Sequence, residues 1–309
     1  MKKYFSFPVG CFLTNSLFFL AFLLGCSPQP PQIVTQNPSP MADSTRTHER
    51  IVAWDLPGVS IQLPGVLSKP VDVYLSNSTD AANQIDLVIH LHGAAFVPNE
   101  AVFQTGKPFI AAAVNLGAGS SAYERPFSPQ HVFPDLVAAI LDTISALRQV
   151  QTTASHIYLT SFSAGYGAVR AILKYHAALL DGIILLDGLH TDYVPAGQPL
   201  AEGGQLNTDK LRDFVEFARQ AADGRTKFLI THSEIFPGTY ASTTETADYI
   251  IASLGLQRQA VLKWGPVGMQ QLSEIRQNNL SILGFAGNTA PDHIDHLHGL
   301  PNFLQILLK

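Results

Sequence analysis

The sequence predicts an α/β protein with a mostly parallel, twisted sheet and helices on both faces. Strand-like and helix-like segments alternate along residues 49–309. Several strand-like segments, such as residues 87–91 and 183–186, are almost wholly apolar, as strands buried on both faces must be. Alternation of this kind is typical of parallel strands joined by crossover helices, and one such domain routinely reaches this length.

The individual elements are expected where β-branched and aromatic residues gather, or where apolar residues recur at helical spacing. The expected strands are residues 51–54, 71–76, 86–92, 109–114, 156–160, 182–186, 227–231 and 280–285. The expected helices are residues 134–150, 164–175, 208–222, 244–254 and 300–308. Two antiparallel strands between residues 51 and 76 are expected to complete one end of the sheet.

The first 25 residues resemble the signal of a bacterial lipoprotein. Lys2 and Lys3 supply a positive end, an apolar run covers residues 17–24, and Cys26 follows closely. The apolar run is short for a spanning helix. We expect cleavage before Cys26 and lipidation of its thiol, which would anchor the protein to a lipid membrane of the bacterial cell envelope, outside the cytoplasm. An ordinary secretory signal and an uncleaved anchor are the alternatives.

Residues 26–48 are expected to form a solvated tether, because they are rich in Pro, Gln, Ser and Thr and lack apolar periodicity. Residues 49–309 would then form one globular domain, expected to be monomeric. The only other cysteine, Cys11, lies inside the signal, so the mature domain has no disulfide and no cysteine nucleophile. With 14% charged residues, a net charge of −5 and no basic cluster, no nucleic-acid partner is expected.

The clearest chemical signal lies in residues 156–175, where a strand-like segment turns directly into a helix-like one. The pentapeptide SFSAG, residues 161–165, stands at the turn. It is a G-x-S-x-G nucleophile elbow with Ser in place of the first Gly. Small residues flank Ser163 because such a turn crowds the backbone, and the helix N-terminus favours developing negative charge. The structural alternative is that Ser163 merely caps the helix.

A second motif, His92-Gly93-Ala94, follows the apolar strand-like segment at residues 87–91. With the elbow and the C-terminal histidines described below, it makes residues 71–309 resemble the α/β-hydrolase superfamily of serine esterases, lipases and peptidases. The resemblance implies an acyl-enzyme mechanism without a cofactor. It also implies an oxyanion hole formed by the N–H groups of Ala94 (or Ala95) and Ala164, each worth about 3 kcal/mol.

The acid of the implied triad has two candidates. In the commonest pattern of the superfamily the acid follows the strand at residues 227–231, where Glu234 is available. Asp187 instead stands directly at the carboxyl end of the apolar strand 182–186. A carboxylate there is costly to bury without a partner, so Asp187 is favoured. Its structural alternative is a cap of the turn at Gly188.

The base is expected near the C-terminus, after the acid, in the chain order typical of this fold. His293, His296 and His298 compete for the role. Relatives often place the catalytic histidine several residues ahead of an amphipathic terminal helix. That spacing favours His293, with His296 as the alternative and His298 too close to the helix.

The favoured function is therefore a lipid-anchored serine hydrolase that cleaves small-molecule or polymer-linked carboxylic esters, or amides. A metal-dependent hydrolase is the second hypothesis, because the same histidines are chemically capable ligands together with Asp292 and Asp295. A non-catalytic binding lipoprotein on the same fold is the third. Further candidates for substrate contact, at or near the carboxyl edge of the sheet, are Tyr123, Arg125, Phe127, His190, Asp192, Tyr193, His232 and Tyr240, while His92 is expected to orient the oxyanion loop.

Overall fold

The computed structural model of the protein describes residues 50–79 and 83–309. The export signal, the lipidation at Cys26 and the tether expected for residues 1–48 lie outside these residues, and they stay predictions. No helix within the described ranges is both long enough and apolar enough to cross a membrane.

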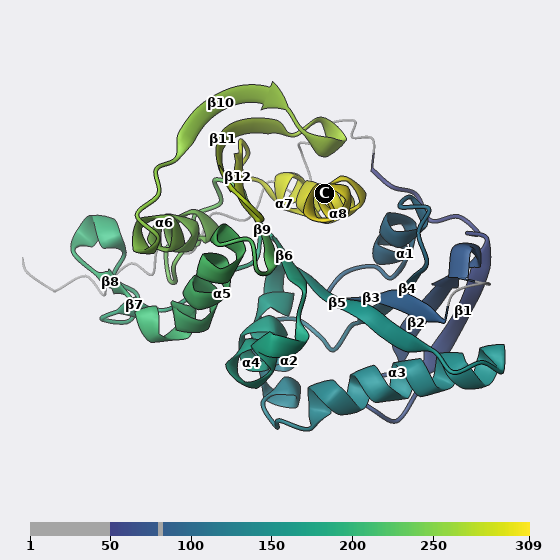
Figure 1. Cartoon of the computed structure of the whole chain (residues 1–309). Coiled ribbons are helices and arrows are strands. Elements are labelled where there is room, and N and C mark those ends of the chain that lie inside the picture. The colour runs from purple at the N-terminus through teal and green to yellow at the C-terminus, as the bar shows by residue number, and fades with distance from the viewer. Residues whose placement is uncertain (1–49, 80–82) are drawn as a thin grey trace, which may run out of the picture. The chain divides into compact units, whose positions relative to one another are not determined.

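A ten-stranded sheet organises the described chain (Figure 1), with the strand order β1-β2-β4-β3-β5-β6-β9-β12-β11-β10. The central strands, from β4 to β12 in this order, run parallel, and antiparallel strands complete both edges. The strands of this sheet are β1 (Gly58–Leu63), β2 (Val71–Ser76), β3 (Gln84–Leu91), β4 (Phe109–Val114), β5 (Thr153–Phe162), β6 (Gly182–Leu186), β9 (Lys227–His232), β10 (Gln259–Trp264), β11 (Gln270–Gln277) and β12 (Leu280–Phe285). A separate short pair consists of β7 (Tyr193–Val194) and β8 (Gln205–Leu206).

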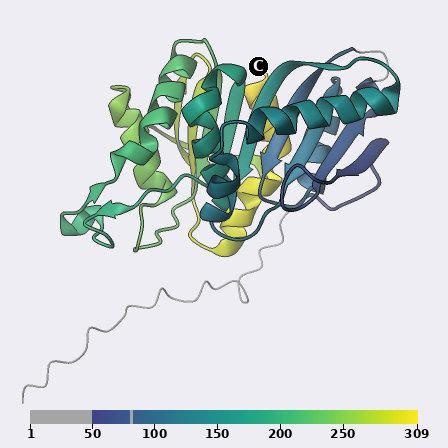
Figure 2. The same cartoon turned by 90° about the horizontal axis from the view of Figure 1, so that it is seen from below.

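Helices cover both faces of the sheet (Figures 1 and 2). The α-helices are α1 (Phe96–Phe103), α2 (Ser121–Phe127), α3 (Val132–Arg148), α4 (Tyr166–His176), α5 (Arg212–Ala222), α6 (Thr243–Ser253), α7 (Ala290–His298) and α8 (Leu300–Leu307). Short 3-10 helices are η1 (Asn77–Thr79), η2 (Ser163–Gly165), η3 (Ala177–Leu179), η4 (Leu200–Glu202), η5 (Thr208–Leu211) and η6 (Pro266–Gly268). The predicted fold class, a mostly parallel sheet with helices on both faces, is confirmed.

Each face of the sheet has its own apolar core. On one face, α2 to α6 bury side chains such as Leu136, Ile172 and Phe214. On the other face, α1, α7 and α8 bury side chains such as Val102 and Phe303. Because the central strands face apolar helices on both sides, they lack the apolar–polar alternation of a half-exposed strand, and every residue of β6 is buried.

The strand expected at residues 51–54 is wrong. That segment lies outside the sheet, and the antiparallel edge strand is β1, which pairs with β2. In this segment, Trp54 makes side-chain contacts and no backbone pairing with a strand. The ring of Trp54 packs edge-on against Phe103 of α1, and its indole N–H donates to Glu100.

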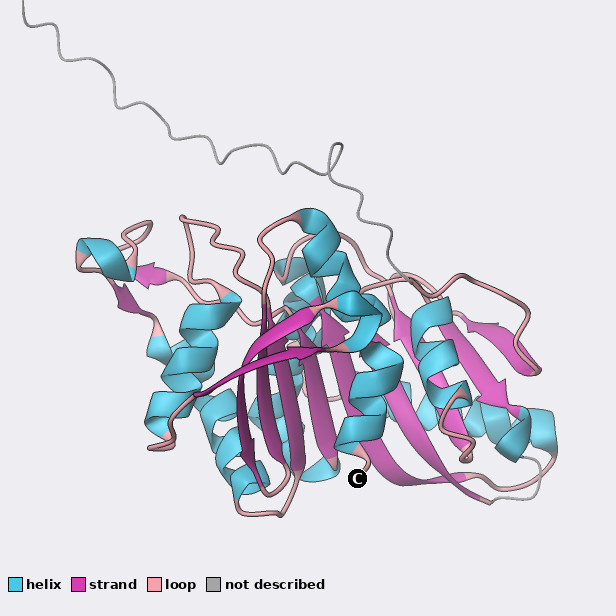
Figure 3. Cartoon of the chain, turned by 90° about the horizontal axis from the view of Figure 1, so that it is seen from above, coloured by secondary structure: helices cyan, strands magenta, loops and turns pink. Residues whose placement is uncertain are grey.

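Several elements have no counterpart among those expected, namely β10, β11, α1, α2 and α7. The hairpin of β10 and β11 forms one edge of the sheet (Figure 3). Strand β10 is exposed at nearly every position, so no apolar alternation reveals it. Of these unexpected elements, α7 matters most for the site, because it carries His293 and His296.

Candidate active site

The ends of β5 and β6 place Ser163 and Asp187 at the same edge of the sheet. Phe162 and Leu186, the last residues of β5 and β6, pair in register. Ser163 and Asp187 directly follow them. Both have positive φ, 47° at Ser163 and 42° at Asp187. Such values are uncommon outside glycine and mark strained turns, which cluster at functional sites. A strained strand-to-helix turn at Ser163 is what a nucleophile elbow requires.

Two glycines allow the close packing of this turn. A Cβ on Gly165 would lie 2.0 Å from the carbonyl oxygen of Leu91, and one on Gly188 would lie 2.3 Å from the carbonyl oxygen of Ser163. Neither approach is possible for another residue without a backbone shift. The turn after β6 therefore lies directly against the backbone of Ser163, and it holds the two strand ends together.

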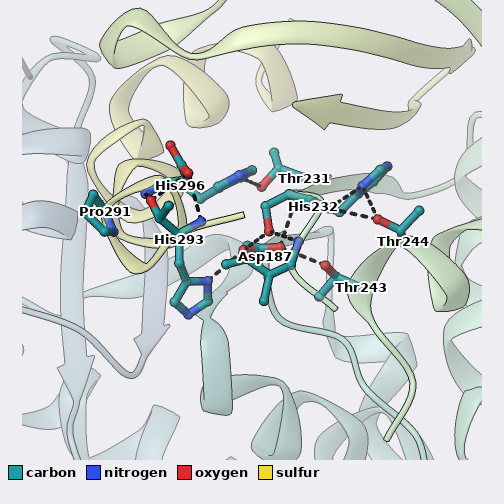
Figure 4. A network of polar contacts seen from close by, with 12 residues as sticks. Asp187, Thr231, His232, Thr243, Thr244, Pro291, His293 and His296 are labelled. Carbon is teal, nitrogen blue, oxygen red and sulfur yellow. Dashed lines mark hydrogen bonds and ion pairs between the residues drawn. The ribbon is translucent and has the colours of Figure 1, made fainter. Parts of the chain in front are cut away.

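Asp187 is buried and accepts hydrogen bonds from three elements. The backbone N–H and the hydroxyl of Ser233 donate to it at 2.8 and 2.7 Å, and the hydroxyl of Thr243 donates at 2.8 Å. Nδ1 of His293 completes the set at 2.7 Å. Figure 4 shows His293 pointing from α7 toward Asp187. These four donors compensate the cost of burying the carboxylate.

Neighbouring groups decide the charge of Asp187. Burial alone would raise its pKa, but the neighbouring His296 and His293 and the N–H of Ser233 outweigh burial and hold the pKa well below its usual range. Asp187 is therefore a carboxylate at neutral pH. A carboxylate only accepts hydrogen bonds, so Nδ1 of His293 carries the proton and Nε2 is left to act as a base.

His293 lies against the elbow. Its ring centroid is 4.4 Å from that of Phe162, the residue before Ser163. Among the hydrogen bonds of the described residues, none joins His293 to the half-buried Ser163. Such bonds are often long without substrate and tighten when it binds, so the arrangement remains compatible with a nucleophile and its base.

Helix α7 decides which histidine faces Asp187. Thr289 and Asp292 form a capping box, with Pro291 in the first turn, so α7 begins before His293. His293 was expected several residues ahead of the terminal helix, but it lies inside a separate helix, α7. The T-x-x-D pattern with its proline was the signal that could have revealed this helix.

His296 occupies a different place from His293. It lies one helical turn further along α7, is fully buried, and its Nδ1 bonds to the hydroxyl of Thr231 at 2.8 Å. Burial lowers its pKa to about 4. His298, at the end of α7, lies beside Phe96 at a centroid distance of 6.1 Å. Of the three histidines, only His293 bonds to Asp187.

Glu234, the alternative acid, lies apart from His293. Its side chain is exposed, and one carboxylate oxygen accepts a hydrogen bond from the N–H of Gly287 at 3.2 Å. The N–H of Glu234 in turn donates to the carbonyl of Gly287 at 2.8 Å. These contacts connect the loops after β9 and β12. The carboxylate that pairs with His293 is that of Asp187.

The turn after β3 contains one candidate oxyanion donor, Ala94, and the turn after β5 contains the other, Ala164. His92 has φ of 72°, and the N–H of Gly93 donates to the side-chain oxygen of Asn115 at 2.9 Å. His92 is held by the hydroxyl of Tyr123 at 2.7 Å from its Nδ1. Within the described chain, the N–H groups of Ala94 and Ala164 make no hydrogen bond to protein. Their role as an oxyanion hole stays a prediction.

The proposed metal ligands do not converge. Among the described residues, no group of three or more His, Cys, Asp or Glu is arranged to hold a metal ion. Asp292 accepts from the N–H and hydroxyl of Thr289 in the helix cap, and Asp295 accepts from Nε of Arg50 at 2.9 Å. These acidic side chains, His293 and His296 are thus engaged with separate partners.

Several supporting residues were not identified from the sequence. Ser233 and Thr243 bind Asp187, Thr231 binds His296, and Asn115 holds the oxyanion loop. Hydroxyl and amide residues are common in loops, so their types alone carry no signal. Only the meeting of loops from different strands gives them a role.

Comparisons with known proteins give structural likeness only. No family model matches the sequence, and no curated protein matches it. A thermostable esterase is 13% identical with a TM-score of 0.45, over 81% of this chain and 61% of that one. A siderophore hydrolase from Aspergillus nidulans is 13% identical with a TM-score of 0.47, over 83% and 96%. An acetyl xylan esterase from Aspergillus awamori is 13% identical with a TM-score of 0.43, over 80% and 100%. Likeness at this level carries no argument about activity.

Buried neutral histidines should make the fold sensitive to acid. Burial lowers the pKa of His90 to about 3, and the pKa of His232 and of His296 to about 4. The unfolded chain binds these protons near pH 6.5 and the folded chain does not. The neutral histidines therefore make their full contribution to the free energy of unfolding above about pH 6.5. This contribution is lost as the pH falls toward 4, by roughly 3 kcal/mol for each histidine.

We expect urea unfolding at pH 7.5 and 4.5 to show a much smaller free energy of unfolding at the lower pH. In the variant His296→Gln, the loss of stability between these two pH values should be smaller than in the wild type. An unfolding free energy that stays constant between these pH values would contradict the assignment of these histidines as neutral.

Proposed function

We propose that the protein is a serine hydrolase that cleaves carboxylic esters through an acyl-enzyme. One observation carries this proposal: the buried Asp187–His293 pair lies against Phe162, next to the strained turn at Ser163. A nucleophile, a base and a group that orients the base are thereby gathered at the carboxyl edge of a parallel sheet. Ligands bind at this edge in open α/β folds.

In the proposed mechanism, Ser163 Oγ attacks the acyl carbon while Nε2 of His293 takes its proton. The N–H groups of Ala94 and Ala164 bind the oxyanion of the tetrahedral intermediate. His293 then gives the proton to the leaving alcohol, and the acyl group stays on Ser163. Water then attacks the acyl-enzyme while His293 takes its proton, and His293 returns this proton to Ser163 Oγ as the bond to the acyl group breaks and the acid is released. Asp187 keeps Nδ1–H of His293 in place throughout and stabilises the imidazolium. Amides would react by the same steps with an amine as leaving group.

A fluorophosphonate probe tests this function directly, because it labels a nucleophilic serine and requires no knowledge of the substrate. We expect the wild type to be labelled at Ser163 equally with and without a chelator, and the variant Ser163→Ala to be unlabelled. An unlabelled wild type whose ester hydrolysis is abolished by chelator would support the metal-dependent hydrolase. A wild type that is neither labelled nor able to hydrolyse esters would support a binding protein on this fold.

Asp187→Asn should cost about 10⁴-fold in kcat, as a change of acid to amide does in triads generally. The amide can present a donor to Nδ1 and thus favour the wrong tautomer of His293. Glu234→Gln is the matched control, because it makes the same chemical change at the exposed neighbour of Gly287. Steady-state ester hydrolysis should show only a mild effect of Glu234→Gln. The reverse ranking would transfer the role of the acid to Glu234.

We also propose that the mature protein begins at a lipidated Cys26 and is held at a membrane of the bacterial cell envelope, outside the cytoplasm. The arrangement of Lys2, Lys3, the apolar run and Cys26 supports this proposal. We expect the wild type to fractionate with membranes and Cys26→Ser to accumulate as an unprocessed precursor. A soluble and fully processed Cys26→Ser protein would indicate an ordinary secretory signal.

A further inference from the structure

Beside the proposed triad lies a group of rings that the mechanism above does not use. We call Tyr166, His190 and Tyr240 the aromatic cluster. The rings of Tyr166 and His190 meet edge to face with centroids 5.5 Å apart, and those of His190 and Tyr240 meet in the same way at 5.0 Å. Edge-to-face packing of this kind is favourable and fixes the orientation of each ring.

The backbone places the cluster next to the reacting serine. Tyr166 is the first residue of α4, directly after the turn that carries Ser163. His190 follows Asp187 by three residues, and the intervening Gly188 lies against the backbone of Ser163. His190 is also close enough to interact electrostatically with Asp187 and His293. The aromatic cluster is therefore part of the surroundings of the site.

Hydrogen bonds hold the cluster in place. Nδ1 of His190 bonds to the carbonyl of Ala241 at 2.8 Å, and the N–H of Ala241 donates to the carbonyl of Thr191 at 2.9 Å. These two contacts attach the loop that carries Tyr240 to the loop after β6. On the other side, the guanidinium of Arg170 lies 5.3 Å from the ring centroid of Tyr166. The rings thus form a preorganised surface.

The hydrogen bond to Ala241 fixes the tautomer of His190. A carbonyl only accepts, so Nδ1 carries the proton. Burial lowers the pKa of His190, so the ring is neutral and Nε2 is an acceptor. Within the described residues Nε2 bonds to no other group, and it is not among the fully buried atoms that lack a partner. A half-buried acceptor thus remains open to a ligand.

Tyr240 supplies an apolar surface beside this acceptor. Its side chain is 43% exposed although the next residue, Ala241, is fully buried. An exposed ring on an anchored backbone offers contact area at little cost in conformational entropy. The cluster therefore combines an aromatic surface with the ring-nitrogen acceptor of His190 and the hydroxyl of Tyr240. A sugar would bring several hydroxyls that each need a partner, whereas a phenol brings one.

We propose that the aromatic cluster is a subsite for a hydroxylated aromatic ring of the ester substrate, which packs on Tyr240 and donates its hydroxyl proton to Nε2 of His190. This inference rests on the proposed ester hydrolysis at Ser163. It assigns the substrate class that the triad alone leaves open: esters of hydroxylated aromatic acids, or esters of alcohols that carry such a ring. The reaction at the acyl carbon is the same in both cases.

Matched substrates test the hydroxyl contact. Methyl 4-hydroxycinnamate and methyl cinnamate place the ring in the acyl part, and 4-hydroxybenzyl acetate and benzyl acetate place it in the alcohol. We expect the wild type to prefer the hydroxylated member of one pair by about tenfold in kcat/KM, the value of one hydrogen bond. The pair that shows the preference identifies which part of the ester occupies the subsite.

Variants of His190 separate the acceptor from the structural role of the ring. His190→Asn keeps an amide donor near the carbonyl of Ala241 but has no acceptor at the position of Nε2, so the hydroxyl preference should disappear. His190→Gln can place an amide oxygen near that position and should retain part of the preference.

Variants of Tyr240 test the aromatic surface. Tyr240→Ala should lower kcat/KM by about tenfold for both members of the pair that shows the preference, and Tyr240→Phe should not. The control is Tyr175→Ala, which removes a similarly exposed tyrosine near the C-terminal end of α4, away from Tyr166. It should leave kcat/KM for all four esters unchanged.

Binding to Ser163→Ala, measured by calorimetry, gives a second readout that needs no turnover. We expect the hydroxylated ester to bind more tightly than its partner, and His190→Asn to remove the difference. Tighter binding without any hydrolysis by the wild type would refute the proposed function and leave the subsite standing. A hydroxyl preference that survives His190→Asn, because this variant loses equally on both members of a pair, would overturn the subsite.

Discussion

Ser163→Ala is expected to abolish ester hydrolysis almost completely, with a loss of about 10⁶-fold in kcat, because the members of a catalytic triad act as a unit. The variant should fold normally. Ser163 is only half-buried, and its hydroxyl makes no hydrogen bond within the described residues. Its strained φ of 47° is imposed by the surrounding turn and does not depend on the hydroxyl. Initial rates on a small ester and a thermal unfolding curve would measure both expectations.

The matched control is Ser161→Gly, which changes another serine of the same pentapeptide. The hydroxyl of Ser161 is fully buried and has no hydrogen-bond partner among the described residues. Glycine is the usual residue at this position of the elbow motif, so the variant should keep most of its activity. A Ser163→Ala protein with near-normal turnover would remove Ser163 from the mechanism. A large loss in Ser161→Gly would show that Ser161 has a role of its own.

The central part of the sheet was predictable because burial on both faces imposes a composition that can be seen in one sequence. The segments expected at residues 71–76, 109–114, 182–186 and 280–285 coincide with β2, β4, β6 and β12. Each is apolar along most or all of its length and ends at a loop. The fold class follows from these strands together with the helical periodicity between them.

The edges of the domain were harder to predict, because tertiary contacts and exposure determine their residues there, and no periodic apolar pattern results. Trp54 belongs to a segment with strand-like composition, yet its ring and its indole N–H are used by α1. In β10, Leu262 and Trp264 are each 75% exposed, so burial does not shape the pattern there. Local propensity is a weak guide at such positions.

The candidate site shows the same division. The positions of Ser163 and Asp187 at one edge of the sheet could be predicted, because each follows an apolar strand directly and neighbouring parallel strands end at one edge. The choice between His293 and His296 could not be made with certainty, since it depends on where α7 begins and how it is rotated. The contacts of Ser233 and Thr243 with Asp187 depend on loop conformations, which no short motif encodes.

His293→Ala is expected to match Ser163→Ala, with a loss of about 10⁶-fold in kcat. Without Nε2 of His293, no group takes the proton of Ser163, and the buried Asp187 loses one of its four donors. The double variant Ser163→Ala/His293→Ala should be no slower than either single variant, because the two residues serve one step. Chelators should change none of these rates, since the proposed mechanism contains no metal.

The neighbouring histidines on α7 supply controls for this prediction. His298→Ala should leave the rate nearly unchanged, because His298 lies at the end of the helix beside Phe96. His296→Gln removes a fully buried ring that bonds to Thr231, so it should lower the stability more than the rate. If His296→Gln matched Ser163→Ala while His293→Ala remained active, the base would be His296 and the Asp187–His293 pair would be structural. A double variant slower than both single variants by a further large factor would show that Ser163 and His293 act in separate steps.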